Sequence, residues 1–143
     1  NFLSSADRFE NIKMLKAINM SNFLIIDAAS DKVHFFLSYN SKSYSKSFYA
    51  SKTNFEKIVT ILFKFLKINN INLDKINNIL VNQGPGRFSS LRISIVITKA
   101  ISLGNNINIY GFNTKDLKDN DYKHVIELFK KKKFKKNLIK IQY

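Results

Sequence analysis

The chain has 143 residues, a formal net charge of +14 at pH 7 and no cysteine. A chain of this length fits one domain around a single core, and the lack of thiols excludes a disulfide framework, a thiolate metal site and a cysteine nucleophile. No apolar run reaches the roughly 20 residues that a membrane-spanning helix needs. We therefore expect a soluble, cytoplasmic domain without a membrane partner.

The positive charge has two interpretations. A strongly basic chain is typical of proteins that bind nucleic acid. However, the chain has 21 lysines and only 3 arginines, and it is rich in Asn, Ile and Phe, whose codons are A/T-rich. Codon bias alone therefore also explains the composition, and arginine, the better bidentate ligand of phosphate, is scarce.

The first three predicted elements are strands of an antiparallel meander. The apolar run from Phe23 to Ile26 ends at Asp27 and is typical of a buried strand. Residues 33–39 and 44–49 follow, with the turn residues Asn40 and Ser41 between them, which predicts a hairpin.

A helix is predicted next, opened by a capping box in which the Thr53 hydroxyl accepts from an amide and Glu56 reaches back. Its apolar positions recur at helical spacing, and Ile61 and Phe63 widen the stripe beyond one sheet contact. The wide stripe indicates either codon bias or a second buried side, covered by a partner.

A second apolar strand, residues 76–81, leads to a corner at Gly84-Pro85-Gly86. The glycines permit a positive φ or close backbone approach, and the proline fixes φ between them. The sequence fits neither GxxxxGK[ST] nor GxGxxG, which leaves a helix N-terminus as a weak anion site. We expect Ser89 to be the N-cap, with Phe88 and Ile93 as a hydrophobic staple.

The next helix is expected to end at Gly104 as its C′ residue, before a fifth strand at residues 107–112. The order βββαβαβ predicts an α/β fold with a mixed five-stranded sheet and crossover helices. Further on, residues 122–129 predict a short helix, and residues 138–141 a last strand or an ordered tail. The lysine run between them is either a solvated segment or a contact for tRNA or an acidic protein; its candidate residues are Lys130, Lys131, Lys132 and Lys133.

Few residues offer catalytic chemistry. His34 and His124 have no metal-ligand neighbours at useful spacing, so we predict no metal site and no cofactor. No Ser-His-Asp or paired-carboxylate arrangement is visible. Asp27, at the end of the first strand, lies where active sites often form, but capping of the following turn is at least an equal explanation.

Residues 84–93, GPGRFSSLRI, resemble the GPGSFTGLRIG signature of the TsaB (YeaZ) family of tRNA threonylcarbamoyladenosine biosynthesis, which is related to the glycopeptidase-like TsaD. Three further stretches match in order: residues 24–29 the "LAIDTS" strand, residues 98–100 the "AKGLA" helix, and residues 109–114 "LVGVSTLEAL". The likeness covers residues 22 to about 117. The signature-loop residues are Gly84, Pro85, Gly86, Phe88, Leu91 and Arg92.

The resemblance implies an N-terminal lobe of the actin/hexokinase/Hsp70-like fold that has no catalytic activity. Such proteins support TsaD, which modifies position 37 of tRNA, and they pair with it or with themselves through two helices. Here these helices correspond to about 54–68 and 90–103. The predicted interface comprises Phe55, Val59, Leu62, Phe65, Leu66, Ile93, Ile97 and Ala100.

The chain departs from the family pattern at several positions. Arg87 replaces Ser, Ser89 replaces Thr, and Ala28 replaces the Thr after Asp27. Ser90 and Ser94 replace Gly, which changes how closely a partner helix can pack on the second helix.

We divide the chain into three parts. Residues 1–19, before Met20, are expected to be an extension or upstream sequence; residues 20–117 form the TsaB-like lobe, and residues 118–143 a basic C-terminal segment. Family members usually continue into a second lobe, so the chain is either a reduced, docking-only form or a fragment of a two-lobed member. The alternatives to a TsaD partner are a basic RNA-binding accessory module and an enzyme akin to the family's transferase or peptidase relatives.

Overall fold

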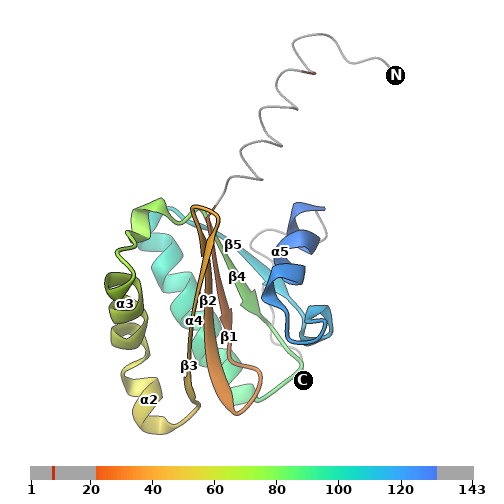
Figure 1. Ribbon diagram of the computed structural model, residues 1–143. Coiled ribbons are helices and arrows are strands. Elements are labelled where there is room, and N and C mark those ends of the chain that lie inside the picture. The colour runs from red at the N-terminus through yellow and green to blue at the C-terminus, as the bar shows by residue number, and fades with distance from the viewer. Residues whose placement is uncertain (1–7, 9–21, 132–143) are drawn as a thin grey trace.

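The computed structural model describes residue 8 and residues 22–131, which contain one mixed five-stranded sheet with helices on both faces (Figure 1). Its strands stand in the order β3-β2-β1-β4-β5. Their bounds are β1 Phe23–Asp27, β2 Lys32–Tyr39, β3 Lys42–Tyr49, β4 Asn78–Asn82 and β5 Asn108–Phe112. The first three pair antiparallel, whereas β4 pairs parallel with both β1 and β5. The predicted meander and the βββαβαβ order are confirmed.

The β2–β3 hairpin turns at the predicted residues. Asn40 and Ser41 have φ angles of 49° and 65°, the left-handed pair that a two-residue turn needs to match the twist of its strands. The central strands β1 and β4 are buried along their whole length, as expected for parallel strands covered on both faces.

Helices form a layer on each face of the sheet (Figure 1). The larger layer consists of α2 (Lys52–Glu56), α3 (Ile58–Ile68) and α4 (Phe88–Asn105), and the main core cluster lies beneath it. The other face carries α5 (Tyr122–Lys130), the predicted short helix, over a smaller cluster around Phe23 and Phe112. Two 3₁₀ turns, Leu73–Lys75 and Thr114–Asp116, complete the described elements.

The predicted capping box at Thr53 is wrong. The helix begins two residues earlier, and the Oγ of Ser51 accepts the amide of Asn54 at 3.2 Å. Lys57, with φ −112° and ψ 9°, then separates α2 from α3. The single predicted helix is therefore two helices, and the apolar stripe belongs to the second.

The predicted ends of the next helix are also wrong. Its N-cap is Arg87, which makes no side-chain cap hydrogen bond, so Ser89 lies within the first turn and Phe88 is not positioned for a staple. The start is fixed by the loop, because the amide of Arg87 donates to the Ala29 carbonyl at 3.0 Å. At the other end Asn106, with φ 55° and ψ 42°, replaces Gly104 as the left-handed residue; asparagine tolerates this region better than other L-residues.

The sheet-facing side of α4 carries small polar residues. Ser90, Ser94 and Thr98 are fully buried. Ser94 and Thr98 donate to the carbonyls of Leu91 and Ser94 at 2.8 and 2.7 Å, whereas the Ser90 hydroxyl oxygen is buried without a partner. Short side chains allow α4 to lie close to β1 and β4, at the cost of one unsatisfied hydroxyl.

Three predictions lie outside the described residues: the extension before Met20 apart from residue 8, the lysines beyond Lys131 and the element at residues 138–141. Within the described part of the chain, no helix has the length and apolar character to cross a bilayer.

Candidate interaction site

The corner between β4 and α4 uses its two glycines differently. Gly84 has a φ of 107° and is joined to Pro85 by a cis peptide bond. At Gly86, an added Cβ atom would lie 2.5 Å from the Ala29 carbonyl oxygen, too close for any side chain. The positive φ and the close approach are the two uses that the sequence predicts for these glycines, and both are confirmed. The corner therefore packs closely against Ala29, which follows β1.

A network of polar side chains holds this corner at the carboxyl ends of β1, β4 and β5. Asn82 donates to Asp27 Oδ1 at 2.9 Å, and its own Oδ1 accepts the amide of Gly84 at 2.8 Å. The Thr114 hydroxyl donates to the Pro85 carbonyl at 2.6 Å. The carboxyl edge of parallel strands is where α/β proteins usually place ligands, but here the polar groups bond to one another.

Asp27 is the centre of this network. Its Oδ1 also accepts the amide of Ala29 at 3.1 Å, and its Oδ2 accepts the hydroxyl of Tyr122 at 2.7 Å. Burial, followed by the charge and the hydrogen bond of Asp27, raises the pKa of Tyr122. The bond to Ala29 is the turn-capping role considered from sequence. The bond to Tyr122 has no local signal, because 95 residues separate the two side chains.

The residues considered for catalysis, His34 and Asp27, form hydrogen bonds within the fold. His34 Nδ1 and Ser47 Oγ share a hydrogen bond of 2.6 Å across β2 and β3, while the hydrogen bonds of Asp27 go to Ala29, Asn82 and Tyr122. Within residues 22–131, no group of three or more His, Asp or Glu side chains lies close enough to hold a metal ion.

The predicted interface divides into buried and exposed residues. Leu62, Phe65 and Leu66 lie in the chain's own core with at most 6% of their surface exposed, so as exposed docking residues they are wrong. They are on the side of α3 that packs on the sheet, where the strongest apolar positions of an amphipathic helix belong. Phe55, Ile93 and Ile97 are half-buried at the edge of that core.

Exposed apolar side chains recur one or two turns apart along α3 and α4, apart from Ile68 at the end of α3 and Phe88 at the start of α4, which are 78% and 44% exposed. Val59 and Phe63 on α3 are 43% and 44% exposed, and Val96 and Leu103 on α4 are 58% and 87% exposed. Ala100 is also exposed and lies between the two α4 residues. Of these, only Val59 and Ala100 belong to the predicted set. We call Val59, Phe63, Val96, Ala100 and Leu103 the apolar face.

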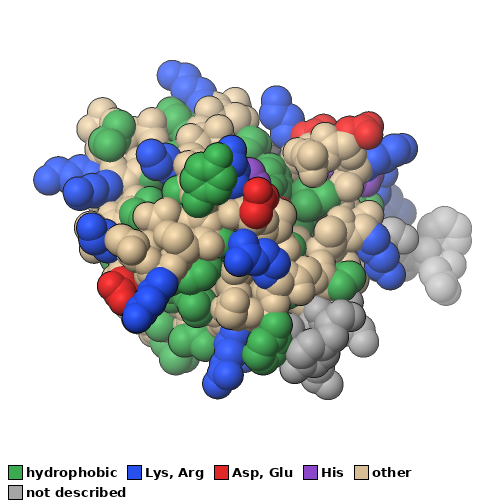
Figure 2. Space-filling view, turned by 90° about the horizontal axis from the view of Figure 1, so that it is seen from below, with side chains coloured by type: hydrophobic (Ala, Val, Ile, Leu, Met, Phe, Trp, Pro, Cys, Tyr) green, Lys and Arg blue, Asp and Glu red, His purple; other side chains and the backbone are tan. Residues whose placement is uncertain are grey.

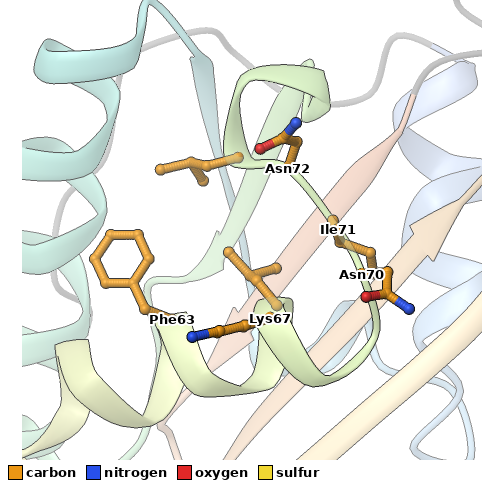
Figure 3. Close-up of a pocket in the computed structure, with 7 residues that line it drawn as sticks. Phe63, Lys67, Asn70, Ile71 and Asn72 are labelled. Carbon is orange, nitrogen blue, oxygen red and sulfur yellow. The ribbon is translucent and has the colours of Figure 1, made fainter.

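A groove adjoins the apolar face at the end of α3. It has a volume of about 590 Å³ and is open to solvent between α3 and the turn that follows it. In Figure 3, Phe63 extends from α3 on the side of α4, and Lys67 lies beside it. The residues that line the groove are Phe63, Leu66, Lys67, Asn70, Ile71, Asn72 and Leu73.

The signature loop combines an inner and an outer part. Leu91 is fully buried, and it fixes the first turn of α4 in the core. Pro85, Gly86, Phe88 and Arg92 are exposed.

Figure 2 views the end of the molecule where β1, β4 and β5 finish, and Lys and Arg side chains are spread around it with hydrophobic ones between them. Lys130 and Lys131 end α5, and Lys132 and Lys133 lie outside the described residues.

Known proteins resemble this chain in sequence and in fold. A family model described as TsaD, tRNA N6-adenosine threonylcarbamoyltransferase, matches residues 13–117. The tRNA threonylcarbamoyladenosine biosynthesis protein TsaB of Buchnera aphidicola subsp. Schizaphis graminum is 37% identical over 71 residues, which are 50% of this chain and 34% of that protein. The TsaB protein of Buchnera aphidicola subsp. Baizongia pistaciae is 38% identical over 50 residues, which are 35% of this chain and 23% of that protein.

The fold has a counterpart among solved structures. YeaZ from Pseudomonas aeruginosa superimposes with a TM-score of 0.62 at 18% identity, covering 68% of this chain and 45% of that one. The matched part thus spans about a third of the first curated relative and less than half of YeaZ. At this identity the match establishes the fold alone, and the predicted α/β fold with a mixed five-stranded sheet is confirmed.

Proposed function

The chain belongs to the TsaD family and, within it, to the TsaB (YeaZ) group, and on this premise we propose that it is a non-catalytic partner of TsaD in tRNA threonylcarbamoyladenosine biosynthesis. It acts in the cytoplasm and docks through the apolar face of α3 and α4. The proposal covers activity and partner alike, because the matched segment is only part of the relatives' length.

The observation that carries the proposal is the apolar face itself. Val96 and Leu103 are large hydrophobic side chains that are more than half exposed, on the same side of one helix. Scattered apolar residues are common on protein surfaces, but a contiguous group on neighbouring elements is typical of interaction sites. The fixed corner at Gly84–Gly86 gives this surface a defined orientation, since it anchors the start of α4 to β1.

The network around Asp27 supports a role without catalysis. Both carboxylate oxygens accept hydrogen bonds from side chains or backbone of the chain itself. A carboxylate used in this way stabilises the junction of β1, β4 and α5.

Co-purification tests the proposal. The tagged chain, expressed with TsaD from the same organism, is expected to retain TsaD through size-exclusion chromatography. The double variant Val96→Asp/Leu103→Asp should lose it, whereas Tyr49→Asp, an equally exposed position on β3, should retain it. If the folded wild-type chain does not retain TsaD, the proposal is wrong.

A second candidate function is contact with tRNA through the basic C-terminal segment. Of its four candidate lysines, Lys130 and Lys131 lie within the described residues, at the C-terminal end of α5. The apolar face lies on the opposite face of the sheet from α5 (Figure 1). A basic contact there leaves that face accessible, so both activities can operate in one complex.

A further inference from the structure

We propose that the apolar face selects a partner whose matching helices carry carboxylates around an apolar centre, and that its charge disfavours pairing with a second copy of this chain. The inference rests on the proposed docking function and goes beyond it, because it states which chemistry decides between a heterodimer and a homodimer.

The two helices that bear the face have cations and no acids. Lys67 on α3 and Arg92 and Lys99 on α4 are exposed, and neither helix contains Asp or Glu. Lys64, the other lysine of α3, lies on a different side of that helix, where it lines a groove with Ser45 and Lys46 of β3. The bias extends along the chain, since residues 57–115 contain eight Lys or Arg residues and one acid, Asp74. Partners inside the chain that would neutralise these cations are therefore scarce.

Helical spacing places the cations around the apolar side chains. Lys67 follows Phe63 by four residues, Arg92 precedes Val96 by four, and Lys99 lies between Val96 and Leu103. Residues three or four apart share a side of a helix. Phe63, Val96 and Leu103 thus each have a cation three or four residues away, whereas Val59 follows the exposed Glu56 by three residues. An apolar centre with a charged rim is common in protein interfaces.

This arrangement opposes self-pairing. A two-fold dimer brings the same surface of both copies together, so three cations from each copy would meet with no carboxylate from either helix. Like charges placed opposite each other disfavour a complex, and complementary ones speed and orient it. A partner with Asp or Glu at the rim satisfies the same cations.

The groove beside Phe63 indicates how such a partner is held. It is lined by Leu66, Ile71 and Leu73 as well as by the polar Lys67, Asn70 and Asn72 (Figure 3). An apolar residue of the partner that enters the groove places a neighbouring carboxylate within reach of Lys67. An apolar anchor with an adjacent charge pair is a common form of binding hot spot.

A charge-reversed copy of the chain tests the proposal without any other protein. Replacing Lys67, Arg92 and Lys99 by Glu changes only exposed side chains and lowers the net charge from +14 to +8 (14 minus 6). The matched control reverses three exposed lysines away from the face, Lys115, Lys118 and Lys123, and has the same net charge. Circular dichroism establishes that each variant is folded.

Sedimentation velocity at low salt then gives the outcome. The wild type mixed with the reversed copy should associate at least about tenfold more tightly than the wild type with itself or with the control, and added salt should remove the difference. Adding Val96→Asp/Leu103→Asp should abolish the mixed dimer. Either of two results overturns the proposal. One is a wild-type homodimer, formed through this face, that is as tight as the mixed dimer, and the other is a mixed dimer no tighter than the wild type with the control variant.

This readout is independent of the proposed function. If TsaD fails to bind the wild type, the docking proposal is wrong while the mixed-copy result still reports on charge selection. If TsaD binds the wild type and the reversed copy equally, charge selection is wrong and docking stands.

Discussion

The hydroxyl of Tyr122 donates a 2.7 Å hydrogen bond to Oδ2 of Asp27 and so fastens α5 to the carboxyl end of β1. The same helix also packs on the sheet through Phe129, whose ring lies 5.2 Å from that of Phe23 and 4.6 Å from that of Tyr110. A hydrogen bond at one end and aromatic packing at the other thus hold the smaller helical layer in place.

Tyr122→Phe should lower the free energy of unfolding by about 1.5–3 kcal/mol, the usual contribution of a hydrogen bond to a charged group. The ring is kept, so the loss reports on the hydroxyl. Urea unfolding measures it, and Tyr49→Phe, at an exposed ring, is the control. Equal stabilities of the wild type and Tyr122→Phe would contradict the role given to this bond.

The same residue predicts a loss of stability at high pH. The pKa of Tyr122 is raised in the folded chain above the ordinary 10.0, first by burial and then by Asp27. The unfolded chain therefore releases the tyrosine proton more readily, and its contribution to stability falls as the pH rises above about 10. The free energy of unfolding should drop more steeply there in the wild type than in Tyr122→Phe, and parallel curves would contradict the prediction.

Gly86→Ala should be strongly destabilising, by about 2 kcal/mol or more, because its Cβ would lie 2.5 Å from a backbone oxygen of Ala29. Gly104→Ala is the matched comparison. Its Cβ would meet nothing within 4 Å, and it lies within α4, so it should stabilise by about 0.5–1 kcal/mol. Thermal unfolding followed by circular dichroism distinguishes the two, and a Gly86→Ala variant as stable as the wild type would show that the corner is not tightly packed.

Ser90→Ala should stabilise the chain by about 1 kcal/mol, since it removes a buried hydroxyl that has no partner. The neighbouring Thr98→Ala should instead destabilise it, because that hydroxyl donates at 2.7 Å to the Ser94 carbonyl. We expect the free energy of unfolding, measured by chemical denaturation, to rise in Ser90→Ala and to fall in Thr98→Ala. Two decreases of similar size would mean that the Ser90 hydroxyl is satisfied in solution.

Binding of tRNA should weaken as salt increases, if the basic segment binds phosphate. Replacing Lys130 and Lys131 by Gln should reduce the slope of log K against log salt by about 1 for each phosphate that is no longer bound. Filter binding at several salt concentrations measures this slope. An unchanged value would exclude these two lysines as phosphate ligands.

The sheet was predictable because its information is local. The apolar run before Asp27 and the turn at Asn40-Ser41 specify strands without reference to the rest of the chain. The start of α4 was not, because its N-cap, Arg87, makes no side-chain cap hydrogen bond. The Arg87 amide is held by Ala29, which is remote in the sequence. The start of α2 is capped locally by Ser51, but Thr53 fits the capping-box pattern in the sequence.

The site was predictable only in part for a similar reason. Periodicity identifies the apolar side of a helix, but it does not say whether the chain's own sheet or a partner covers that side. Leu62, Phe65 and Leu66 satisfied the pattern best and proved to be core. The exposed Val96 and Leu103 lie outside that stripe, and only the position of α4 on the sheet reveals them.

The central claim, docking of TsaD on the apolar face, is tested most directly by the dissociation constant of the complex, measured by isothermal titration calorimetry. Removal of one central anchor typically costs about 2 kcal/mol or more, so Val96→Asp/Leu103→Asp should weaken binding by about a hundredfold or more, while Tyr49→Asp leaves it unchanged. Equal affinities of the wild type and the double variant, both folded, would contradict the claim.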